Sequence, residues 1–197
     1  MKKNLLILIF LLFLSGFNHP NDLAAWVVLE GSSLTVKGST NINTFHCDIT
    51  NYAMPDTLSC LIKNIKGQSL TMNGRLNLNI EAFDCHNKMM TNDLRKTLKS
   101  NSFPNLTIRF LSINSFPNFE HPVAISGKIE IGLAGVTKQF DINYVFTLDK
   151  FQHVNLVGGR LINFSDFNLI PPVKLGGVIK ANDALDVAFK LNLKPIA

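Results

Sequence analysis

The feature that most constrains how this chain folds is an alternation of apolar and polar residues that recurs along its 197 residues. Successive side chains of a β-strand point to opposite faces of the sheet, so this alternation is typical of strands with one buried and one solvated face. The segments that show it are residues 26–29, 34–37, 43–49, 58–63, 76–81, 106–113, 123–133, 140–149 and 185–194. The pattern therefore predicts a chain made mainly of strands.

One segment departs from the alternation, and turn-forming residues separate the others. Between Lys88 and Lys99 the apolar residues fall near helical spacing, and Asn101 and Pro104 follow as at a helix end. Breakers occur at residues 54–56, 66–67, 73–74, 114–117, 134–135, 157–159 and 171–172. Short strands without a βαβ rhythm predict an all-β fold with one short helix at about residues 88–99. The strands form either an antiparallel sandwich or a closed barrel of about eight strands.

The N-terminus has the pattern of a secretory signal peptide. Lys2 and Lys3 precede an apolar run at residues 5–14, and the small residues Ser15 and Gly16 follow it. A run of that length is too short for a membrane-spanning helix, which needs about 20 residues. We therefore expect a signal peptide at residues 1–17, cleaved between 16 and 25, and one mature domain at 24–197 without a transmembrane anchor. The protein is then a bacterial periplasmic or secreted one.

Composition excludes two classes of protein. With 46% hydrophobic and only 17% charged residues, the chain is not intrinsically disordered. The formal net charge of +5 falls to +3 without the two lysines of residues 1–17, so no nucleic-acid partner is expected. Twelve of the fifteen Phe lie beyond residue 17, mostly on or beside predicted strands. They either form a solid core or line a cavity, and the alternation does not decide between the two.

Three cysteines, Cys47, Cys60 and Cys85, fit an exported protein, because disulfides persist in oxidising compartments. One bridge and one free thiol is the simplest arrangement, and all three pairings are open. Cys47 and Cys60 both fall at apolar positions of the alternation, on two neighbouring predicted strands, so they could lie opposite each other. A zinc site from the His-Cys and Cys-His pairs at 46–47 and 85–86 is not expected. Adjacent strand residues point to opposite faces, and the Cys-x2-Cys spacing of zinc ligands is missing.

The sequence contains no motif for catalysis. It lacks the G-x-S-x-G elbow, the P-loop, H-E-x-x-H and G-x-G-x-x-G. The histidines at 46, 86, 121 and 153 lie in or beside separate strands and turns. The aspartates at 141, 149, 166 and 186 fall mostly at positions on the solvated face of predicted strands. We therefore expect no enzymatic activity, no cofactor and no metal ion.

Several segments together resemble the YceI-like family of secreted proteins. Residues Gly38–Cys47 resemble the second strand of the family, and Gly127–Ile131 followed by Gly135–Lys138 is similar to its hairpin signature G-x-L-x-I-x-G-V-T-K. The other matching segments are Phe83–Asn87, Met90, Asp93–Leu94, Leu98–Lys99, Phe103–Pro104, Ile108–Phe110, Asp166–Phe167, Pro171–Pro172 and Val187–Leu193. Together they cover nearly the whole mature chain in the family's order.

Two segments depart from the family pattern. Asn41 and Asn43 stand where the family often has a His, and residues 164–168 read Phe-Ser-Asp-Phe-Asn in place of Arg-x-Asp-Phe-Gly. The replaced His and Arg are candidate contacts to a lipid head group. The resemblance therefore implies a lipid ligand without identifying its head group.

The resemblance implies an extended lipocalin-like barrel that binds a polyisoprenoid lipid, and a disulfide between Cys47 and Cys85 that leaves Cys60 unpaired. A lipid tail needs a dry, elongated cavity, and the candidate lining residues are Phe110, Ile129, Ile131, Phe146, Phe164, Phe167, Val187 and Phe189. We therefore expect a carrier or store of an isoprenoid or other long-chain lipid. The alternative is a ligand-free barrel that acts through its surface as an envelope interaction or stress-response module. The oligomeric state, monomer or homodimer, is open.

Overall fold

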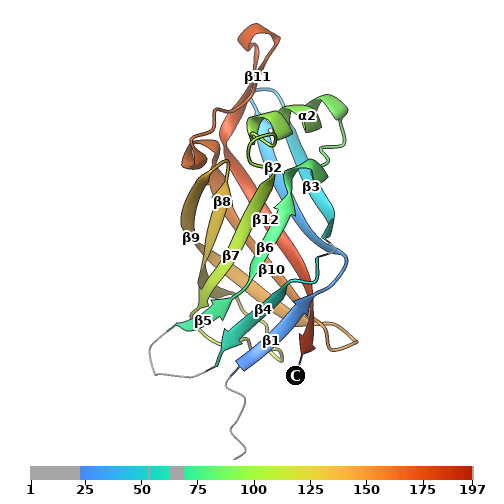
Figure 1. The fold of residues 1–197 in the computed structure, drawn as a ribbon, viewed down its shortest axis with the longest axis vertical. Coiled ribbons are helices and arrows are strands. Elements are labelled where there is room, and N and C mark those ends of the chain that lie inside the picture. The colour runs from blue at the N-terminus through green and yellow to red at the C-terminus, as the bar shows by residue number, and fades with distance from the viewer. Residues whose placement is uncertain (1–22, 53, 63–68, 197) are drawn as a thin grey trace, which may run out of the picture.

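The computed structural model describes residues 23–52, 54–62 and 69–196, which form a tall antiparallel barrel with a helix at one end (Figure 1). Its strands are β1 (Leu23–Val28), β2 (Ser32–Thr40), β3 (Thr44–Tyr52), β4 (Thr57–Leu61), β5 (Leu70–Asn73), β6 (Arg75–Asn79), β7 (Asn105–Ile113), β8 (Ile125–Leu133), β9 (Val136–Leu148), β10 (Val154–Asn163), β11 (Val173–Lys174) and β12 (Ile179–Ile196). Its helices are η1 (Ile80–Ala82), α2 (Lys88–Thr97), η2 (Phe164–Phe167) and η3 (Leu175–Gly177). The signal peptide expected at residues 1–17 and the turn expected at 66–67 lie outside the described residues.

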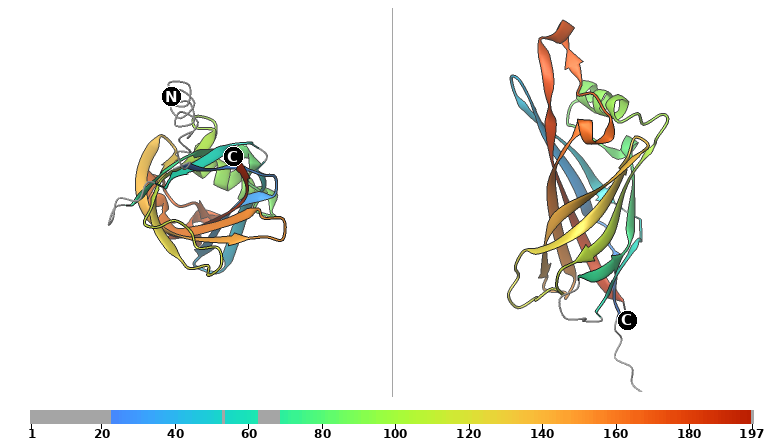
Figure 2. Two further views of the ribbon diagram at one scale, coloured as in Figure 1. Left: turned by 90° about the horizontal axis from the view of Figure 1, so that it is seen from below. Right: turned by 90° about the vertical axis from the view of Figure 1, so that its left-hand side faces the viewer.

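The strands close into an eight-stranded antiparallel barrel. Three of the eight positions in the barrel are each occupied by two strands that follow each other along the chain: β1 and β2, β3 and β4, and β5 and β6. Closure comes from β12, whose first part pairs with β2 and whose last part pairs with β1. The ring of strands is visible along the barrel axis (Figure 2, left). The lipocalin-like all-β fold is confirmed, and the strands form the barrel rather than the sandwich.

One seam of the barrel is closed differently, between β3 and the segment that follows β6. Among the described residues no strand ladder joins β3 to β6. A single β-bridge joins Asp48 to Asp84 instead, with N–H to carbonyl distances of 2.8 and 2.9 Å in the two directions. Next to this bridge, Cys47 and Cys85 form a disulfide. The helix end of the barrel is therefore held closed here by one bridge and one covalent bond.

The predicted alternation determines which side chains fill the barrel. In β9, Ile142, Tyr144 and Phe146 are buried, whereas Asp141 and Asn143 between them are exposed. The buried faces of the other strands join these residues in one continuous apolar core. One face of each strand is therefore buried and the other solvated, as expected for an antiparallel sheet.

One predicted break is wrong. The Val-Gly-Gly sequence at residues 157–159 lies in the middle of β10, which pairs with β9 on one side and β12 on the other. A Cβ atom on Gly158 would lie 2.5 Å from Cζ of Phe189. Glycine at this position leaves room for the phenylalanine ring inside the barrel. The glycines therefore mark a close approach within a strand and not the end of one.

Helix α2 confirms the helical spacing predicted over residues 88–99. Asn87 caps its N-terminus, because the Asn87 side chain accepts the N–H of Met90 at 3.1 Å. Leu94 and Leu98 are buried against the end of the barrel, whereas Met89 is exposed. Figure 2 shows α2 covering the barrel end beside the β11–β12 segment. No helix in the described part of the chain is long and apolar enough to cross a membrane.

Candidate ligand-binding site

A small apolar cavity lies inside the barrel below α2. Its volume is about 40 Å³. The side chains around it are all apolar: Val36, Phe83, Leu94, Leu98, Leu106, Ile108, Ile131, Leu133, Ile162, Leu185 and Val187. They come from the helix and from strands on several sides, so the inner cavity forms where α2 covers the barrel.

A second, larger hollow of about 250 Å³ opens at the surface beside α2, and we call it the mouth. Its lining residues are Thr40, Asn43, Phe45, Cys47, Asn87, Met89, Met90, Asp93, Leu94, Phe164, Pro172, Lys174, Ile179 and Ala181. Leu94 lines both the mouth and the inner cavity, so this side chain lies between them. The two hollows therefore form an apolar path from the surface into the barrel, interrupted at Leu94.

Polar contacts hold the edge of the mouth in place. The Lys174 ammonium donates to the Asp93 carboxylate at 2.6 Å, which joins β11 to α2. The Asn41 side chain donates to the carbonyl of Val178 and accepts the N–H of Lys180, each at 2.9 Å. Asn41, which stands where the resemblance places a His, therefore connects the β2–β3 turn to the start of β12.

The second departure from the family pattern also lies at the mouth. Phe164 is buried and lines the mouth, so an apolar ring replaces the Arg of the usual pattern. Asn168 follows η2 in the left-handed conformation, with φ of 54°. Asn adopts this conformation more readily than most side chains, which explains how it replaces Gly. The mouth is therefore more apolar than the family pattern implies.

Exposed apolar side chains surround the mouth end of the barrel. Ile170 and Leu175 are 84% and 73% exposed, and the others are Ile42, Met89, Val173 and Val178. We call these six residues the apolar rim. They lie on the β2–β3 turn, on α2 and on residues 170–180, which extend beyond the barrel beside the helix (Figure 2, right). Residues 170–180 also carry Lys174 and Lys180 and no acidic residue.

Aromatic rings fill the interior farther from the mouth. Phe110 lies edge-on to Phe189, with ring centroids 5.6 Å apart. Tyr144 packs against Phe110, Phe146 and Phe189 at centroid distances of 6.2, 6.1 and 6.3 Å. The Tyr144 hydroxyl is buried without a hydrogen-bond partner among the described residues, and burial raises its pKa. We call these four residues the aromatic cluster.

The residues predicted to line a cavity are distributed over several places in the barrel. Ile131 and Val187 line the inner cavity, and Phe164 lines the mouth. The others are Phe110, Phe146 and Phe189 in the aromatic cluster, Ile129 in β8 and Phe167 in η2. Whether a ligand contacts them stays a prediction. The sequence-based set omits Phe45, Leu94 and Leu98, although the helical spacing of the two leucines already predicted an apolar face on α2.

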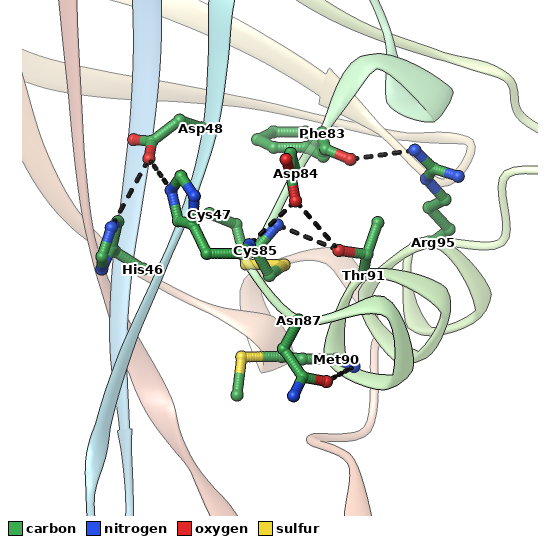
Figure 3. The surroundings of a disulfide bond; sticks show 11 residues. His46, Cys47, Asp48, Phe83, Asp84, Cys85, Asn87, Met90, Thr91 and Arg95 are labelled. Atoms are coloured by element: carbon green, nitrogen blue, oxygen red, sulfur yellow. Dashed lines mark hydrogen bonds and ion pairs between the residues drawn. A yellow bond between two sulfur atoms is a disulfide. The ribbon is translucent and has the colours of Figure 1, made fainter.

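The disulfide between Cys47 and Cys85, implied by the family resemblance, is confirmed (Figure 3). It fixes β3 to the segment that leads into α2, beside the mouth. Cys60 is free and fully buried, and burial raises the pKa of its thiol to about 11. The Cys60 thiol is therefore protonated at neutral pH and has the character of an inert core residue.

Comparison with known proteins finds similarity at the level of the fold. No family model and no curated protein sequence matches the chain. A polyisoprenoid-binding domain from Saccharophagus degradans, implicated in plant cell wall breakdown, matches with a TM-score of 0.60 at 14% identity, over 87% of this chain and 98% of that one. BcnA of Burkholderia cenocepacia matches with a TM-score of 0.55 at 12% identity, over 81% of this chain and 95% of that one.

The YceI protein of Campylobacter jejuni gives a TM-score of 0.43 at 15% identity, over 64% of this chain and 73% of that one. The two matches with higher TM-scores carry the comparison. They show that the chain has the fold of the polyisoprenoid-binding domain, as the resemblance to the YceI-like family implied. At these sequence identities they show the fold alone.

Proposed function

We propose that this chain is a periplasmic or secreted binding protein that holds a polyisoprenoid or similar amphiphilic lipid in its barrel, as a carrier or a store. The observation that carries the proposal is the apolar path from the mouth past Leu94 into the inner cavity. The fold shared with a domain described as polyisoprenoid-binding supports it. The leader pattern at residues 1–17 and the Cys47–Cys85 disulfide support export to an oxidising compartment.

Apolar burial alone supplies enough free energy to hold a lipid tail. Each methylene removed from water contributes about 0.8 kcal/mol. The mouth and the inner cavity have volumes of about 250 and 40 Å³, both below the ~300–1,000 Å³ of typical ligand pockets. A long tail therefore requires Leu94 and the interior side chains to move apart. The tail would then meet the predicted lining residues, from Phe164 at the mouth to the aromatic cluster.

The apolar rim supports loading of the ligand at a bilayer surface. Exposed apolar side chains on a small protruding segment can insert at the boundary between head groups and acyl chains. Lys180 lies on the same segment, and a Lys near an anionic membrane surface contributes about 1 kcal/mol of attraction, whereas the charge of Lys174 is paired with Asp93. With the rim inserted, the mouth opens next to the bilayer. A lipid tail then passes into the barrel with little exposure to water.

Native mass spectrometry without detergent tests the proposal. The protein is measured as purified from its own cell envelope, and again after incubation with phosphatidylglycerol vesicles that contain a polyprenol. We expect one lipid per chain in at least one preparation. A lipid-free mass in both would contradict the proposal and favour the alternative, a barrel that acts through its surface.

The passage at Leu94 gives a sharper test. Leu94→Trp would fill the space between the mouth and the inner cavity, so we expect at least tenfold less bound polyprenol. Overpacking of this kind costs about 1–3 kcal/mol, so circular dichroism is used to show that the variant is folded. The matched control is Leu161→Trp, on the exposed outer face of β10, which should bind lipid as the wild type does. Equal uptake by both variants would show that the lipid does not use this path.

A further inference from the structure

Two imidazoles and a carboxylate meet on the outer surface of the barrel. An Asp48 carboxylate oxygen lies 3.0 Å from Nε2 of His86 and 3.7 Å from Nε2 of His46. The two imidazole rings have centroids 4.7 Å apart. One ligand atom from each of the three residues lies within 4.8 Å of the other two. Both imidazoles are more than half exposed, so ions in solution can reach the cluster.

The register of β3 places two of these side chains together. His46 and Asp48 are two residues apart on the strand, so both point to the outer face, whereas Cys47 between them is buried. Figure 3 shows His46 and Asp48 extending from the same strand beside the disulfide. Thr35 lies directly across from Asp48 in the β2–β3 ladder.

A covalent bond and a β-bridge bring the third side chain to this pair. Cys47 and Cys85 are joined by the disulfide, and Asp84 forms the β-bridge with Asp48. Next along the chain, the N–H of His86 donates to the Asp84 side chain at 2.8 Å. The main chain on both sides of the cluster is therefore fixed in the protein itself, and an ion would not have to assemble the site.

The negative charge of the Asp48 side chain suits a residue that binds a cation. An aspartate side chain is ionised at neutral pH, and a hydrogen bond with Thr35 holds the carboxylate of Asp48. Hydrogen bonds to a ligating carboxylate also orient it toward a metal ion.

The two distances from Asp48 fit the coordination geometry of a transition-metal ion. With bonds of about 2.0–2.1 Å to imidazole nitrogen and carboxylate oxygen, the ligand atoms of a tetrahedral site lie about 3.4 Å apart. The observed distances of 3.0 and 3.7 Å from Asp48 lie on either side of that value. Imidazole nitrogen favours ions such as Zn²⁺ and Cu²⁺, whereas Mg²⁺ and Ca²⁺ favour sites made of oxygen.

We propose that His46, Asp48 and His86 form a binding site for a divalent transition-metal ion of the zinc type. Three protein ligands leave a position for water or another exchangeable ligand. The proposal departs from the expectation of no metal ion, which considered the thiolates of Cys47 and Cys85 as partners of the two histidines. The disulfide consumes both thiolates, and the carboxylate two residues from His46 takes their place. The site does not depend on the lipid-binding function.

Titration with Zn²⁺ in competition with a chromophoric chelator tests the site on the full mature chain. We expect one equivalent of Zn²⁺ per chain. His46→Gln, His86→Gln and Asp48→Asn should each weaken binding at least tenfold. The matched control is His153→Gln, because His153 also pairs with an aspartate at the surface, at 3.5 Å from Asp149. His153→Gln should bind Zn²⁺ as the wild type does.

A measurement on the wild type makes the test independent of how the variants fold. In NMR spectra, Zn²⁺ should shift the ring resonances of His46 and His86 and leave those of His121 and His153 in place. Absence of a bound equivalent in the titration, or equal losses of affinity in His46→Gln and His153→Gln, would overturn the proposal.

Discussion

Two buried tyrosine side chains have opposite hydrogen-bonding environments. The Tyr52 hydroxyl accepts the N–H of Asn77 at 3.0 Å and donates to the Asp56 carboxylate. The Tyr144 hydroxyl has no partner among the described residues. A buried hydroxyl without a partner costs about 1–3 kcal/mol of stability, whereas a typical satisfied hydrogen bond contributes about 1 kcal/mol. The same substitution at the two positions should therefore have opposite effects.

We expect Tyr144→Phe to raise the free energy of unfolding by about 1 kcal/mol and Tyr52→Phe to lower it by about 1–2 kcal/mol. Urea unfolding at pH 7, followed by circular dichroism, measures both differences under identical conditions. Each variant serves as the control for the other, because both lose one oxygen from a buried ring. A loss of stability in Tyr144→Phe as large as that in Tyr52→Phe would contradict the assignment.

At the scale of single residues, strand parity predicts burial better than it predicts polar contacts. The alternation correctly predicts that Phe146 is buried and that Asp141 is exposed. It does not predict the partners of the partly exposed Asp166, whose carboxylate accepts the N–H of Asn163 at 2.8 Å and the Lys138 ammonium at 3.1 Å. The Lys138 contact depends on how η2 folds back against β9, whereas the Asn163 contact is a local cap of η2. Such contacts between elements have no period in the sequence.

At the scale of elements, the 3₁₀ helix η2 depends on Asp166, which lies in its first turn. Burial by itself would raise the pKa of the Asp166 carboxyl. The hydrogen bonds with Asn163 and Lys138 and the Lys138 charge outweigh burial and lower the pKa below its ordinary value of 3.8. A carboxyl with a lowered pKa in the folded state stabilises that state above its ordinary pKa. This stabilisation is lost as the pH falls through the ordinary value toward the lowered one.

We therefore expect Asp166→Asn to lower the free energy of unfolding by about 1 kcal/mol at pH 7, the usual size for a lost cap. The difference from the wild type should shrink as the pH falls below 3.8 toward the lowered pKa of Asp166. Urea unfolding at a series of pH values measures it. Asp186→Asn, at an exposed position on β12, is the control and should differ little from the wild type at any pH. A difference for Asp166→Asn that is the same at pH 7 and pH 2 would rule out the carboxylate as its cause.

The elements with a clear period were predictable, and those defined by packing were not. Helix α2 and strand β9 follow from spacing and from turn residues alone. Strand β10 does not, because Gly158 alone predicts a break in the strand. Its reason, the ring of Phe189 packed against it, appears only in the folded barrel. The requirement for glycine there arises from β12, about thirty residues later in the chain. A local pattern contains no information about such a neighbour.

At the scale of the whole molecule, the barrel depends on its seam at Cys47–Cys85. The two cysteines are 38 residues apart in the sequence. For a loop of this length the chain-entropy account gives a stabilisation of about 4 kcal/mol, within a usual range of about 2–4. The bond also holds the helix end of the barrel closed, where the Asp48–Asp84 bridge is the other connection.

We expect the double variant Cys47→Ala/Cys85→Ala to lower the free energy of unfolding by about 2–4 kcal/mol. The far-ultraviolet circular dichroism spectrum of β-structure should persist, because β12 still pairs with β10, β2 and β1. Urea unfolding measures the loss, and wild-type protein unfolded with a thiol reductant should show a similar one. A loss below about 1 kcal/mol would show that strand pairing alone closes the seam.

The sequence predicted a barrel or a sandwich, and the choice between them needed long-range pairing. Alternation defines which face of a strand is buried but not which strands meet, and β12 pairs with strands from both ends of the chain. The mouth also arises from long-range pairing of the strands. Its residues come from the segments 40–47, 87–94 and 164–181, which only the closed barrel brings together. The sequence therefore predicted apolar side chains for a site without predicting its entrance.

The position of β12 also governs when the molecule can first exist as a barrel. β12 pairs with β10 on one side and with β2 and β1 on the other, and it follows all of them in the chain. During synthesis, the edges of these strands remain without their partner until residues 179–196 have been made. Unpaired edges are sites of aggregation. The barrel therefore cannot close, and these edges cannot be covered, before β12 has been made.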